Sequence, residues 1–360
     1  MQRRSLLQHT GIAGVLAAGV APAVQAQPVV RWRLVSSFPK SLDTIYGAGE
    51  VFAQALRAMS GGRFEVQVHA GGDLLPAFDV LDAVQGGTME VAHTAPYYFY
   101  ERHPAFALGS AIPFGFNARQ MNAWMLHGHG RRLMNEFYAG YNIVSFAGGN
   151  TGTQMGGWYL KEIRSPADFK GLKMRLGGGL VGEVLAHLGV TPLNLPGGQT
   201  YEALQSGSID AAEWIGPHDD QQLDLHKVAS YYYYPGWWEG GPEMNFYIHR
   251  KAFDALSAEH KALVQGAAAI AHTDMLAKYD ARNPAALKQL VAARTRVLPF
   301  TNAVMDAAFR ASMEVFAQND AKSPEWKKIY ADMRAFQRDQ ILWFRFAESR
   351  YDAYLSAQKI

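Results

Sequence analysis

The sequence predicts an α/β protein of two lobes with a ligand cleft between them, crossover strands that join the lobes, and a long C-terminal helix. Two stretches of the chain support this fold class, because the same order of elements is expected in both. The order strand, helix, strand, helix, strand is expected twice, over residues 30–94 and again over residues 172–215. That order implies a parallel sheet covered by helices. Two such units in one chain favour two lobes, and a cleft between lobes is a usual place for a small-molecule site.

The first unit is predicted from alternation, capping residues and glycine pairs. Apolar and polar residues alternate over its first strand, and Ser41 or Asp43 can cap the helix that follows. Gly61-Gly62 and Gly86-Gly87 end the two helices. The expected elements are a strand at 30–38, a helix at 41–56, a strand at 64–69, a helix at 78–85 and a strand at 89–94.

The second unit follows a strand expected at 142–147. Its expected elements are a strand at 172–176, a helix at 182–188, a strand at 191–195, a helix at 201–205 and a strand at 210–215. Two long strand candidates, at 149–160 and 243–250, lie between the units and are interpreted as the crossovers. After Ser257 the chain is expected to be helical except for a strand at 295–300.

The last element is predicted to be one long helix. Ser323-Pro324-Glu325 places a capping residue before a proline in the first turn, and apolar residues keep helical spacing from Trp326 to Leu355. A helix of about 35 residues spans roughly 50 Å, which is more than one lobe is wide. We therefore expect a homodimer formed through this helix; the alternative is that the helix crosses the back of both lobes. The expected division of the chain is residues 28–148 with 241–280 for lobe I, 149–240 with 281–322 for lobe II, and 323–360 for the C-terminal helix.

Residues 1–26 are predicted to be an export signal. Arg3-Arg4 provide the charged start, a short apolar segment follows, and Ala26 ends a small-residue cleavage site. The arginine pair resembles a twin-arginine signal, and ordinary secretion is the alternative. Without this segment the chain has as many basic as acidic residues, so it lacks the electrostatic footprint of a nucleic-acid binder. Cysteine is absent, which excludes disulfides and thiolate zinc sites. We expect a soluble periplasmic protein.

Arg175 is the most informative charged residue. Alternation puts Lys173 and Arg175 on one face of the strand 172–176, and Arg175 lies at its carboxyl end, where α/β sheets bind ligands. Its planar guanidinium suits a carboxylate bound through two hydrogen bonds; a surface ion pair is the alternative. The turn that follows, Gly177 to Gly182, matches G-x-G-x-x-G. However, the strand 191–195 does not end in the acidic residue that a dinucleotide site needs for the ribose.

Glu213 ends the strand 210–215 beside Trp214. A glutamate in this position is either solvated at the strand end or held in a partly buried site to face a cation or a proton. Gln154 lies among glycines in a crossover strand, where glycine lets a ligand approach closely. Gln154, Glu213 and Glu239 together offer oxygen donors that would suit a hard cation.

Other groups of polar and aromatic residues are weaker candidates for a functional site. His127 and His129 lack an evident third metal ligand, and the segment His218 to Asp220 is expected to be solvated. The aromatic run 231–238 is expected to be mostly core and sheet edge. The sequence contains no Ser–His–Asp order and no nucleophile elbow, so no catalytic triad is predicted.

Three segments resemble DctP-type solute-binding proteins of tripartite ATP-independent periplasmic (TRAP) transporters. They are EIRSPADFKGLKMR at 162–175, LGVTPLNLP at 188–196 and YEALQSGSIDAAEW at 201–214, and the likeness covers essentially the whole mature chain. Residues 36–44, 149–158 and 236–240 resemble the branch that binds 2-oxo or 2-hydroxy monocarboxylates with a metal cation. The resemblance implies a two-lobed periplasmic binding protein that captures a small organic acid and delivers it to a TRAP membrane permease.

The resemblance also implies roles for single residues. Arg175 would pair with the carboxylate of the acid, and Gln154 and Glu213 would contact both the acid and the cation. The cation, Na⁺ or Ca²⁺, would be held by the side chains of Gln154, Glu213 and Glu239 and by the main-chain carbonyl of Trp214. The opposite wall is expected to be lined by Asn150 and by the stretch 97–100, from which Tyr97 and Tyr100 are the expected ligand contacts.

The alternative class of function is an exported metal-dependent enzyme, a lyase or hydratase acting on the same acids. Such an enzyme would need a positioned acid or base besides the ligating carboxylates. No histidine obviously lies near these motifs. We therefore expect a binding protein that is not an enzyme.

Overall fold

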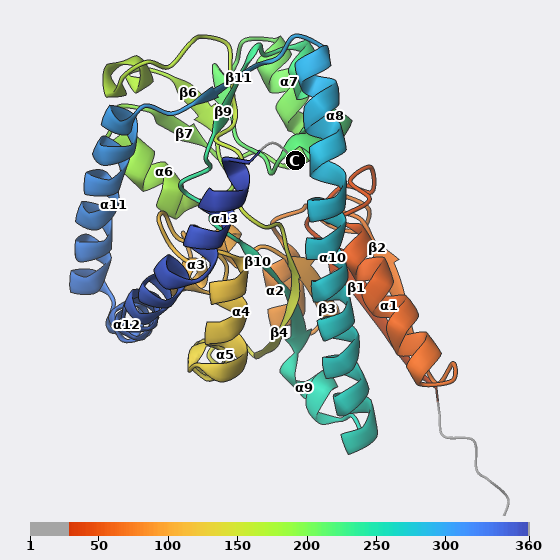
Figure 1. The fold of residues 1–360 in the computed structure, drawn as a ribbon. Coiled ribbons are helices and arrows are strands. Elements are labelled where there is room, and N and C mark those ends of the chain that lie inside the picture. Colours follow the sequence, from red (N-terminus) through yellow and green to blue (C-terminus); the bar gives the residue numbers. More distant parts are fainter. Residues whose placement is uncertain (1–28, 359–360) are drawn as a thin grey trace, which may run out of the picture.

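The computed structural model describes residues 29–358, so the predicted export signal lies outside the described residues. Two α/β lobes are stacked one above the other in Figure 1. The helices are α1 Gly47–Met59, α2 Val80–Gln85, α3 Ala105–Leu108, α4 Ala118–His127, α5 Gly130–Ala139, α6 Gly179–Ala186, α7 Thr200–Gln205, α8 Pro217–Gln222, α9 Arg250–Asp254, α10 Ala258–Ala292, α11 Asn302–Lys322, α12 Pro324–Phe346 and α13 Glu348–Ser356. The short 3-10 helices are η1 Pro96–Phe99, η2 Pro166–Phe169, η3 Gly197–Gln199 and η4 Leu225–Lys227. The strands are β1 Val30–Ser36, β2 Phe64–His69, β3 Val91–Thr94, β4 Ile143–Asn150, β5 Trp158–Tyr159, β6 Lys173–Arg175, β7 Thr191–Leu193, β8 Ala211–Ala212, β9 Tyr231–Tyr234, β10 Glu243–His249 and β11 Arg296–Pro299.

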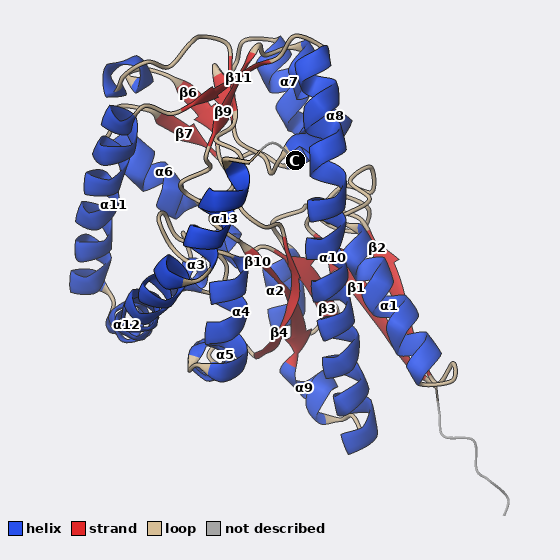
Figure 2. Cartoon of the chain, in the orientation of Figure 1, coloured by secondary structure: helices blue, strands red, loops and turns tan. Residues whose placement is uncertain are grey.

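The lower lobe is built on a five-stranded sheet with the order β2-β1-β3-β10-β4 (Figure 2). β1 pairs in parallel with β2 and β3, as the first strand–helix unit predicts. β10 runs antiparallel between β3 and β4, because it is the strand that returns from the other lobe. The side chains of Leu34, Val91 and Phe246 are buried in this sheet.

The upper lobe has a six-stranded sheet with the order β11-β9-β5-β8-β6-β7. β6 pairs in parallel with β7 and β8, and β5, the first strand after the chain has crossed, runs antiparallel to both of its neighbours. The register aligns Arg175 with Ala212. Since the carboxyl ends of β6 and β8 meet at one edge of the sheet, Arg175 and Glu213 come together there.

The outgoing crossover, expected at 149–160, is not one continuous strand. β4 ends at Asn150, and β5 covers only two residues. Between them, Gly157 has a φ of 81°, and a Cβ at this position would lie 2.7 Å from the carbonyl oxygen of Ala212. The chain turns here in a conformation that glycine permits, which interrupts the strand.

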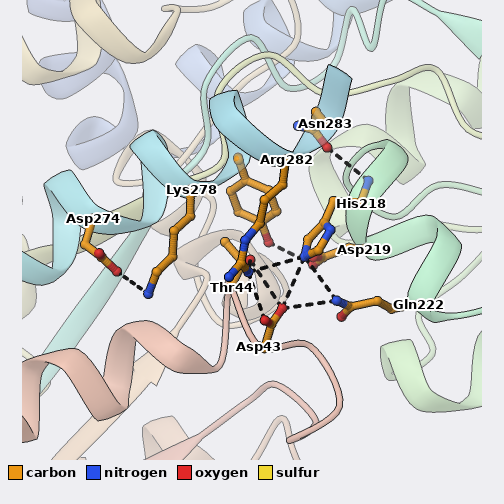
Figure 3. Close-up of polar contacts among 10 residues, drawn as sticks. Asp43, Thr44, His218, Asp219, Gln222, Asp274, Lys278, Arg282 and Asn283 are labelled. Carbon is orange, nitrogen blue, oxygen red and sulfur yellow. Dashed lines mark hydrogen bonds and ion pairs between the residues drawn. The ribbon is translucent and has the colours of Figure 1, made fainter. Parts of the chain in front are cut away.

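The first helix begins at Gly47, later than capping by Ser41 or Asp43 would give. Asp43 instead joins the two lobes, as Figure 3 shows. It precedes α1 in the lower lobe, and its Oδ1 atom lies 3.1 Å from Nε2 of both His218 and Gln222 on α8. This carboxylate therefore forms polar contacts with the upper lobe.

Arg282 of α10 completes this group of contacts. Its Nη1 atom donates to Asp43 Oδ2 at 2.9 Å and to the Thr44 hydroxyl at 2.7 Å (Figure 3). We call Asp43, Thr44, His218, Gln222 and Arg282 the Asp43 cluster. It ties a loop of the lower lobe to α8 of the upper lobe and to α10.

The long helix α10 runs along both lobes (Figure 1). It packs on α1 and β4 in the lower lobe and on α8 in the upper lobe. The alternative to a dimer, from the sequence, is a C-terminal helix that crosses both lobes. In the structure it is α10, a helix of 35 residues, that crosses them. Among residues 29–358, no helix has the length and apolar character needed to cross a membrane.

The C-terminal helix is present and begins as predicted. The Ser323 hydroxyl accepts a hydrogen bond from the Trp326 amide at 3.1 Å, and Pro324 occupies the first turn. The helix is interrupted near its end, because Ala347 has φ −97° and ψ −98°. It is thus divided into α12 and α13. The buried residues of α12 lie between Trp326 and Gln337, and α13 has no buried residue.

Candidate ligand-binding site

A small polar cavity lies where the two lobes meet. It has an empty volume of about 220 Å³. The upper lobe contributes the ends of β6 and β8 and the segment between β4 and β5, and the lower lobe contributes η1. The predicted site residues that line it are Tyr97, Gln154, Arg175, Glu213 and Trp214.

Arg175 is buried in this cavity, with 1% of its surface exposed, so it is not a surface ion-pair residue. Its Nε atom donates to the Leu195 carbonyl at 3.0 Å. Its Nη1 atom donates to the Glu213 carbonyl and, at 3.0 Å, to the Glu213 carboxylate. The guanidinium carbon also lies 4.7 Å from the centre of the Trp214 ring. These contacts fix the guanidinium, while its Nη2 atom makes no hydrogen bond among the described residues and can bind an anionic oxygen.

Glu213 and Glu239 are both almost fully buried. Burial raises the pKa of Glu213 to about 7, although Arg175 and the Gly177 amide favour its charged form. Burial also raises the pKa of Glu239 well above its usual value, and repulsion by Glu213 adds to this effect. Two carboxyl groups that repel each other beside one arginine form a place where a cation would relieve the repulsion.

Gln154 adds an oxygen atom to these carboxyl groups. The backbone N–H of Gln154 donates to the backbone carbonyl of Glu239 at 3.1 Å, which holds the two residues side by side. Gln154 Oε1 and Glu239 Oε2 are buried and make no hydrogen bond in the described part of the chain. Unsatisfied buried oxygens beside a second carboxylate fit a hard cation such as Na⁺ or Ca²⁺. Since residues 29–358 contain no cluster of three or more His, Cys, Asp or Glu suited to a metal, a cation here would also need amide, main-chain or ligand oxygens.

Two predicted ligand contacts do not line the cavity. The Asn150 side chain donates to the Gly241 carbonyl at 2.9 Å and accepts from the Gly152 amide at 2.9 Å, so it fastens the two crossing segments together. The Tyr100 hydroxyl donates to Glu183 at 2.8 Å and accepts from Asn319 at 2.9 Å. Both side chains are held by other partners, which directs them away from the cavity.

Two other polar residues, Thr151 and Tyr98, line the cavity; one of them, Tyr98, belongs to the stretch 97–100 that was expected on its wall. Burial raises the pKa of the Tyr98 hydroxyl, and the neighbouring Arg175 opposes this rise. Thr151 could have been found, because it belongs to the same glycine-rich crossover as Gln154. Nothing in the local pattern distinguishes Tyr98 from its aromatic neighbours. Ile45, Ile215 and Met244 complete the wall, and no sequence signal points to them.

The glycine run 177–179 is where the upper lobe closes against the tyrosines of the lower lobe. A Cβ on Gly178 would lie 3.0 Å from the Tyr97 ring, and a Cβ on Gly179 would lie 2.6 Å from the Tyr100 ring. The Gly177 amide donates to Glu213 at 2.9 Å. The glycines of the G-x-G-x-x-G match therefore allow close contact between the lobes.

We expect Gly179→Ala to hinder closure of the lobes and to weaken ligand binding by about 10-fold. The added methyl group would overlap the Tyr100 ring, and overpacking of this kind costs about 1–3 kcal/mol. Gly198→Ala is the matched control, because a Cβ at Gly198 meets nothing within 4 Å. Calorimetric titration of both variants with the acid provides the test. Equal affinities would show that the close contact at Gly179 does not limit closure.

The other candidate constellations have structural explanations. His127 and His129 are both exposed, and His129 lies 2.7 Å from Asp332. The expectation that Asp219 and Asp220 are solvated is wrong, since they are 0% and 1% exposed.

Asp220 has a clear structural role. Its carboxylate accepts hydrogen bonds from Trp158 Nε1 at 2.9 Å and from the Tyr232 hydroxyl at 2.7 Å, so it joins α8 to the upper sheet. Burial raises the pKa of Asp219 to about 7 and that of Asp220 to about 6. These carboxyl groups support the segment that follows Glu213.

Two α/β lobes joined by crossing strands, with a polar cavity between them, are an architecture that suits a solute-binding protein. The sequence model of bacterial extracellular solute-binding protein family 7, the DctP family, matches residues 35–322. The chain belongs to this family, which confirms the predicted family. It is thus a periplasmic solute-binding protein.

Individual relatives are similar over nearly the whole chain. A monocarboxylate 2-oxoacid-binding periplasmic protein of a Nostoc species is 42% identical, with 100% of both chains covered. A TRAP transporter solute-binding protein of Bordetella bronchiseptica has a solved structure with 44% identity and a TM-score of 0.90, covering 92% of this chain and 98% of that one. A TRAP periplasmic solute-binding protein of Pseudoalteromonas atlantica, solved with sodium and pyruvate, has 36% identity and a TM-score of 0.87, covering 92% of this chain and 100% of that one.

Proposed function

We propose that this protein captures a small 2-oxo or 2-hydroxy monocarboxylate together with Na⁺ or Ca²⁺ and delivers it to a TRAP membrane permease. The observation that carries the proposal is that Arg175, the buried Glu213 carboxyl group and the unsatisfied Gln154 amide oxygen line one small cavity. The buried carboxyl group of Glu239 does not line this cavity, but Glu239 adjoins Gln154 behind its wall. The relatives support it. The Nostoc protein is described as binding 2-oxoacids, the Pseudoalteromonas protein holds sodium and pyruvate, and the Bordetella protein holds calcium and picolinate.

The chemistry of the cavity favours an acid that chelates the cation. Glu213 and Glu239 repel an anion, whereas Arg175 attracts one. A cation held by the oxygens of Gln154, Glu213, Glu239 and the Trp214 carbonyl would accept the carboxylate and the 2-oxygen of the ligand. Because both ligand oxygens would then be used, acids that lack the 2-oxygen should bind poorly.

Titration calorimetry with pyruvate, lactate and propionate tests this proposal. We expect pyruvate or lactate to bind in calcium, to bind much more weakly after a chelator has removed the cation, and to bind better than propionate in every case. Propionate differs from pyruvate mainly by the missing 2-oxygen. Equal binding of propionate and pyruvate would contradict the proposed chelation.

We propose that the protein is a receptor without enzymatic activity. Its relatives are solute-binding proteins, and the Glu213 and Glu239 carboxyl groups are assigned to the cation. Nuclear magnetic resonance of pyruvate or lactate after long incubation with protein and cation distinguishes the two classes. Unchanged ligand is the expected result, and any new product would support the lyase or hydratase alternative.

We propose that residues 28–148 with 241–280 and residues 149–240 with 281–322 move as two lobes. The Asp43 cluster and the glycine run 177–179 would be their closing contacts, and hinge closure around a ligand is common in periplasmic binding proteins.

The Arg3-Arg4 pair supports export by a twin-arginine route. That route would deliver a folded protein.

We propose that the protein forms a homodimer through its C-terminal helix. Phe346, Tyr351 and Tyr354 are 75%, 66% and 67% exposed, and Trp343 is 59% exposed. Exposed aromatic residues that are close in sequence favour a partner surface. The related Bordetella structure is described as a dimer.

Light scattering at micromolar concentration should give the mass of a dimer. Deletion of residues 344–360 should give a monomer, because it removes most of the exposed aromatic residues. Deletion of residues 357–360 alone is the control and should leave the dimer intact. A monomer mass for the undeleted protein would contradict the proposal.

A further inference from the structure

A second cavity lies on the other side of β10 from the acid site. It has an empty volume of about 820 Å³, opens to solvent, and is bounded by α4, α5, β4, β10 and α10. Consecutive residues of a strand point to opposite faces: Met244 lines the acid cavity, whereas Glu243 lines this one. The cavity therefore adjoins the segment where the chain returns from the upper lobe.

Glu243 is an unusual residue for such a place. It is 1% exposed. Its Oε1 atom accepts one long hydrogen bond, 3.4 Å from Asn245 Nδ2, and its Oε2 atom is buried and makes no hydrogen bond within residues 29–358. A buried carboxyl group without a partner is costly, so an atom on a ligand is the natural complement to Oε2.

The groups that face Glu243 supply no positive charge. Tyr138 lies on α5, and Tyr247 on β10 interacts with both Tyr138 and Glu243. His272 on α10 is held neutral, because burial lowers its pKa to about 4. Arg131 belongs to the wall and is exposed to solvent. Burial raises the pKa of Glu243 well above its usual value, as expected for a carboxyl group without a counter-charge.

The rest of the wall is mainly apolar. Met125, Met134, Phe146 and Ala268 line it. An apolar chain of a ligand could lie along these residues, with a polar end at Glu243. A cationic end would form a buried ion pair, and the aromatic rings of Phe146 and Tyr138 would also favour a cation.

We propose that this cavity binds a small amine with an apolar body, whose protonated amino group pairs with Glu243. The site is separate from the acid site and uses none of its residues. An ammonium group brings hydrogen atoms for Oε2 and the positive charge that the protein does not provide. A carboxylate in the same place would find no positive charge among the groups that face Glu243, and a neutral alcohol would supply none to Glu243.

Three probes of equal length test the proposal: hexylamine, hexanol and hexanoate, each titrated by calorimetry into the full mature protein. We expect hexylamine to bind at least about 10-fold more tightly than hexanol, and hexanoate not to bind. Glu243→Gln keeps the shape of the side chain but cannot give up a proton to become charged when the ammonium binds, and it should reduce hexylamine affinity at least about 10-fold. Glu202→Gln, at an exposed glutamate on α7, is the matched control and should change nothing.

Ala268→Leu gives a second test that does not depend on the stability of the Glu243 variant. Ala268 is 2% exposed and lies on the α10 wall, so a larger side chain should occupy the space of the ligand and abolish hexylamine binding. Three results would overturn the proposal. They are equal binding of hexanol and hexylamine, unchanged hexylamine binding by both variants, and failure of hexylamine to bind the unaltered protein. Binding of the acid is not measured, so the result is independent of the function proposed above.

Discussion

Arg175→Ala is expected to remove acid binding, with a loss of affinity of at least about 100-fold, or ~2.7 kcal/mol. Truncation of one partner in a buried charge pair commonly costs about 2–5 kcal/mol. Arg175 is the only lysine or arginine among the residues that line the acid cavity, and its Nη2 atom makes no hydrogen bond within the described chain. Calorimetric titration of the folded variant with pyruvate in excess calcium measures the loss.

The variant needs a folding control, because Arg175 also holds the Glu213 carboxylate at 3.0 Å. Removal of the arginine leaves that carboxyl group buried without its partner, which lowers the free energy of unfolding. Circular dichroism and a thermal melt establish that the variant is folded. Arg164→Ala is the matched control, since Arg164 belongs to the same lobe and its side chain is 78% exposed. Unchanged acid affinity in folded Arg175→Ala would refute the role of this arginine.

Arg175→Lys should also bind the acid poorly. The guanidinium donates simultaneously to Leu195 and to two oxygens of Glu213, and it still has Nη2 for the ligand. A lysine ammonium cannot reproduce this planar arrangement. The Arg175→Lys variant keeps the positive charge but loses the planar geometry. Its acid affinity therefore shows whether charge alone or the orientation of the donors accounts for binding.

Much of the geometry of the candidate site could be predicted because local patterns and parallel pairing determine it. Alternation in the strand of Arg175 gives the face of that side chain, and parallel strands bring their carboxyl ends to one edge. The register that aligns Arg175 with Ala212 then brings Glu213 beside it. The glycines around Gln154 mark a close approach of chain segments, which the structure contains.

The structure differs from the predictions made from the sequence where tertiary contacts override local conformational preference. Asp43 is a good capping residue by sequence, but its carboxylate binds Arg282, which is 239 positions away. The family resemblance implied Asn150 as a ligand contact, but its side chain binds Gly241 and Gly152, and Thr151, the next residue, lines the cavity. Glu243 belongs to a strand predicted only as a crossover, and no local pattern reveals a cavity behind it.

Glu213→Gln is expected to weaken cation and acid binding together, each by about 10- to 100-fold. The cation would lose one of two carboxylates, and the acid would lose part of the cation that it chelates. Binding free energies of linked sites change reciprocally. Calorimetric titrations with calcium and with pyruvate, each with and without the other, measure this coupling.

The Glu213 variant alone does not identify the cause, because Glu213 also accepts hydrogen bonds from Arg175 and from the Gly177 amide. Glu239→Gln separates the two roles, since the Glu239 Oε2 atom makes no hydrogen bond in the described chain, and the amide oxygen of glutamine can still accept from the neighbouring Tyr97 hydroxyl. If both carboxylates hold the cation, the two variants should lose calcium affinity to a similar degree, and a chelator should reduce acid binding by the unaltered protein. Glu162→Gln, at a glutamate on the surface of the same lobe that pairs with Arg164, should leave both affinities unchanged. An acid affinity that neither the chelator nor Glu239→Gln alters would mean that the buried carboxyl groups serve the fold and hold no cation.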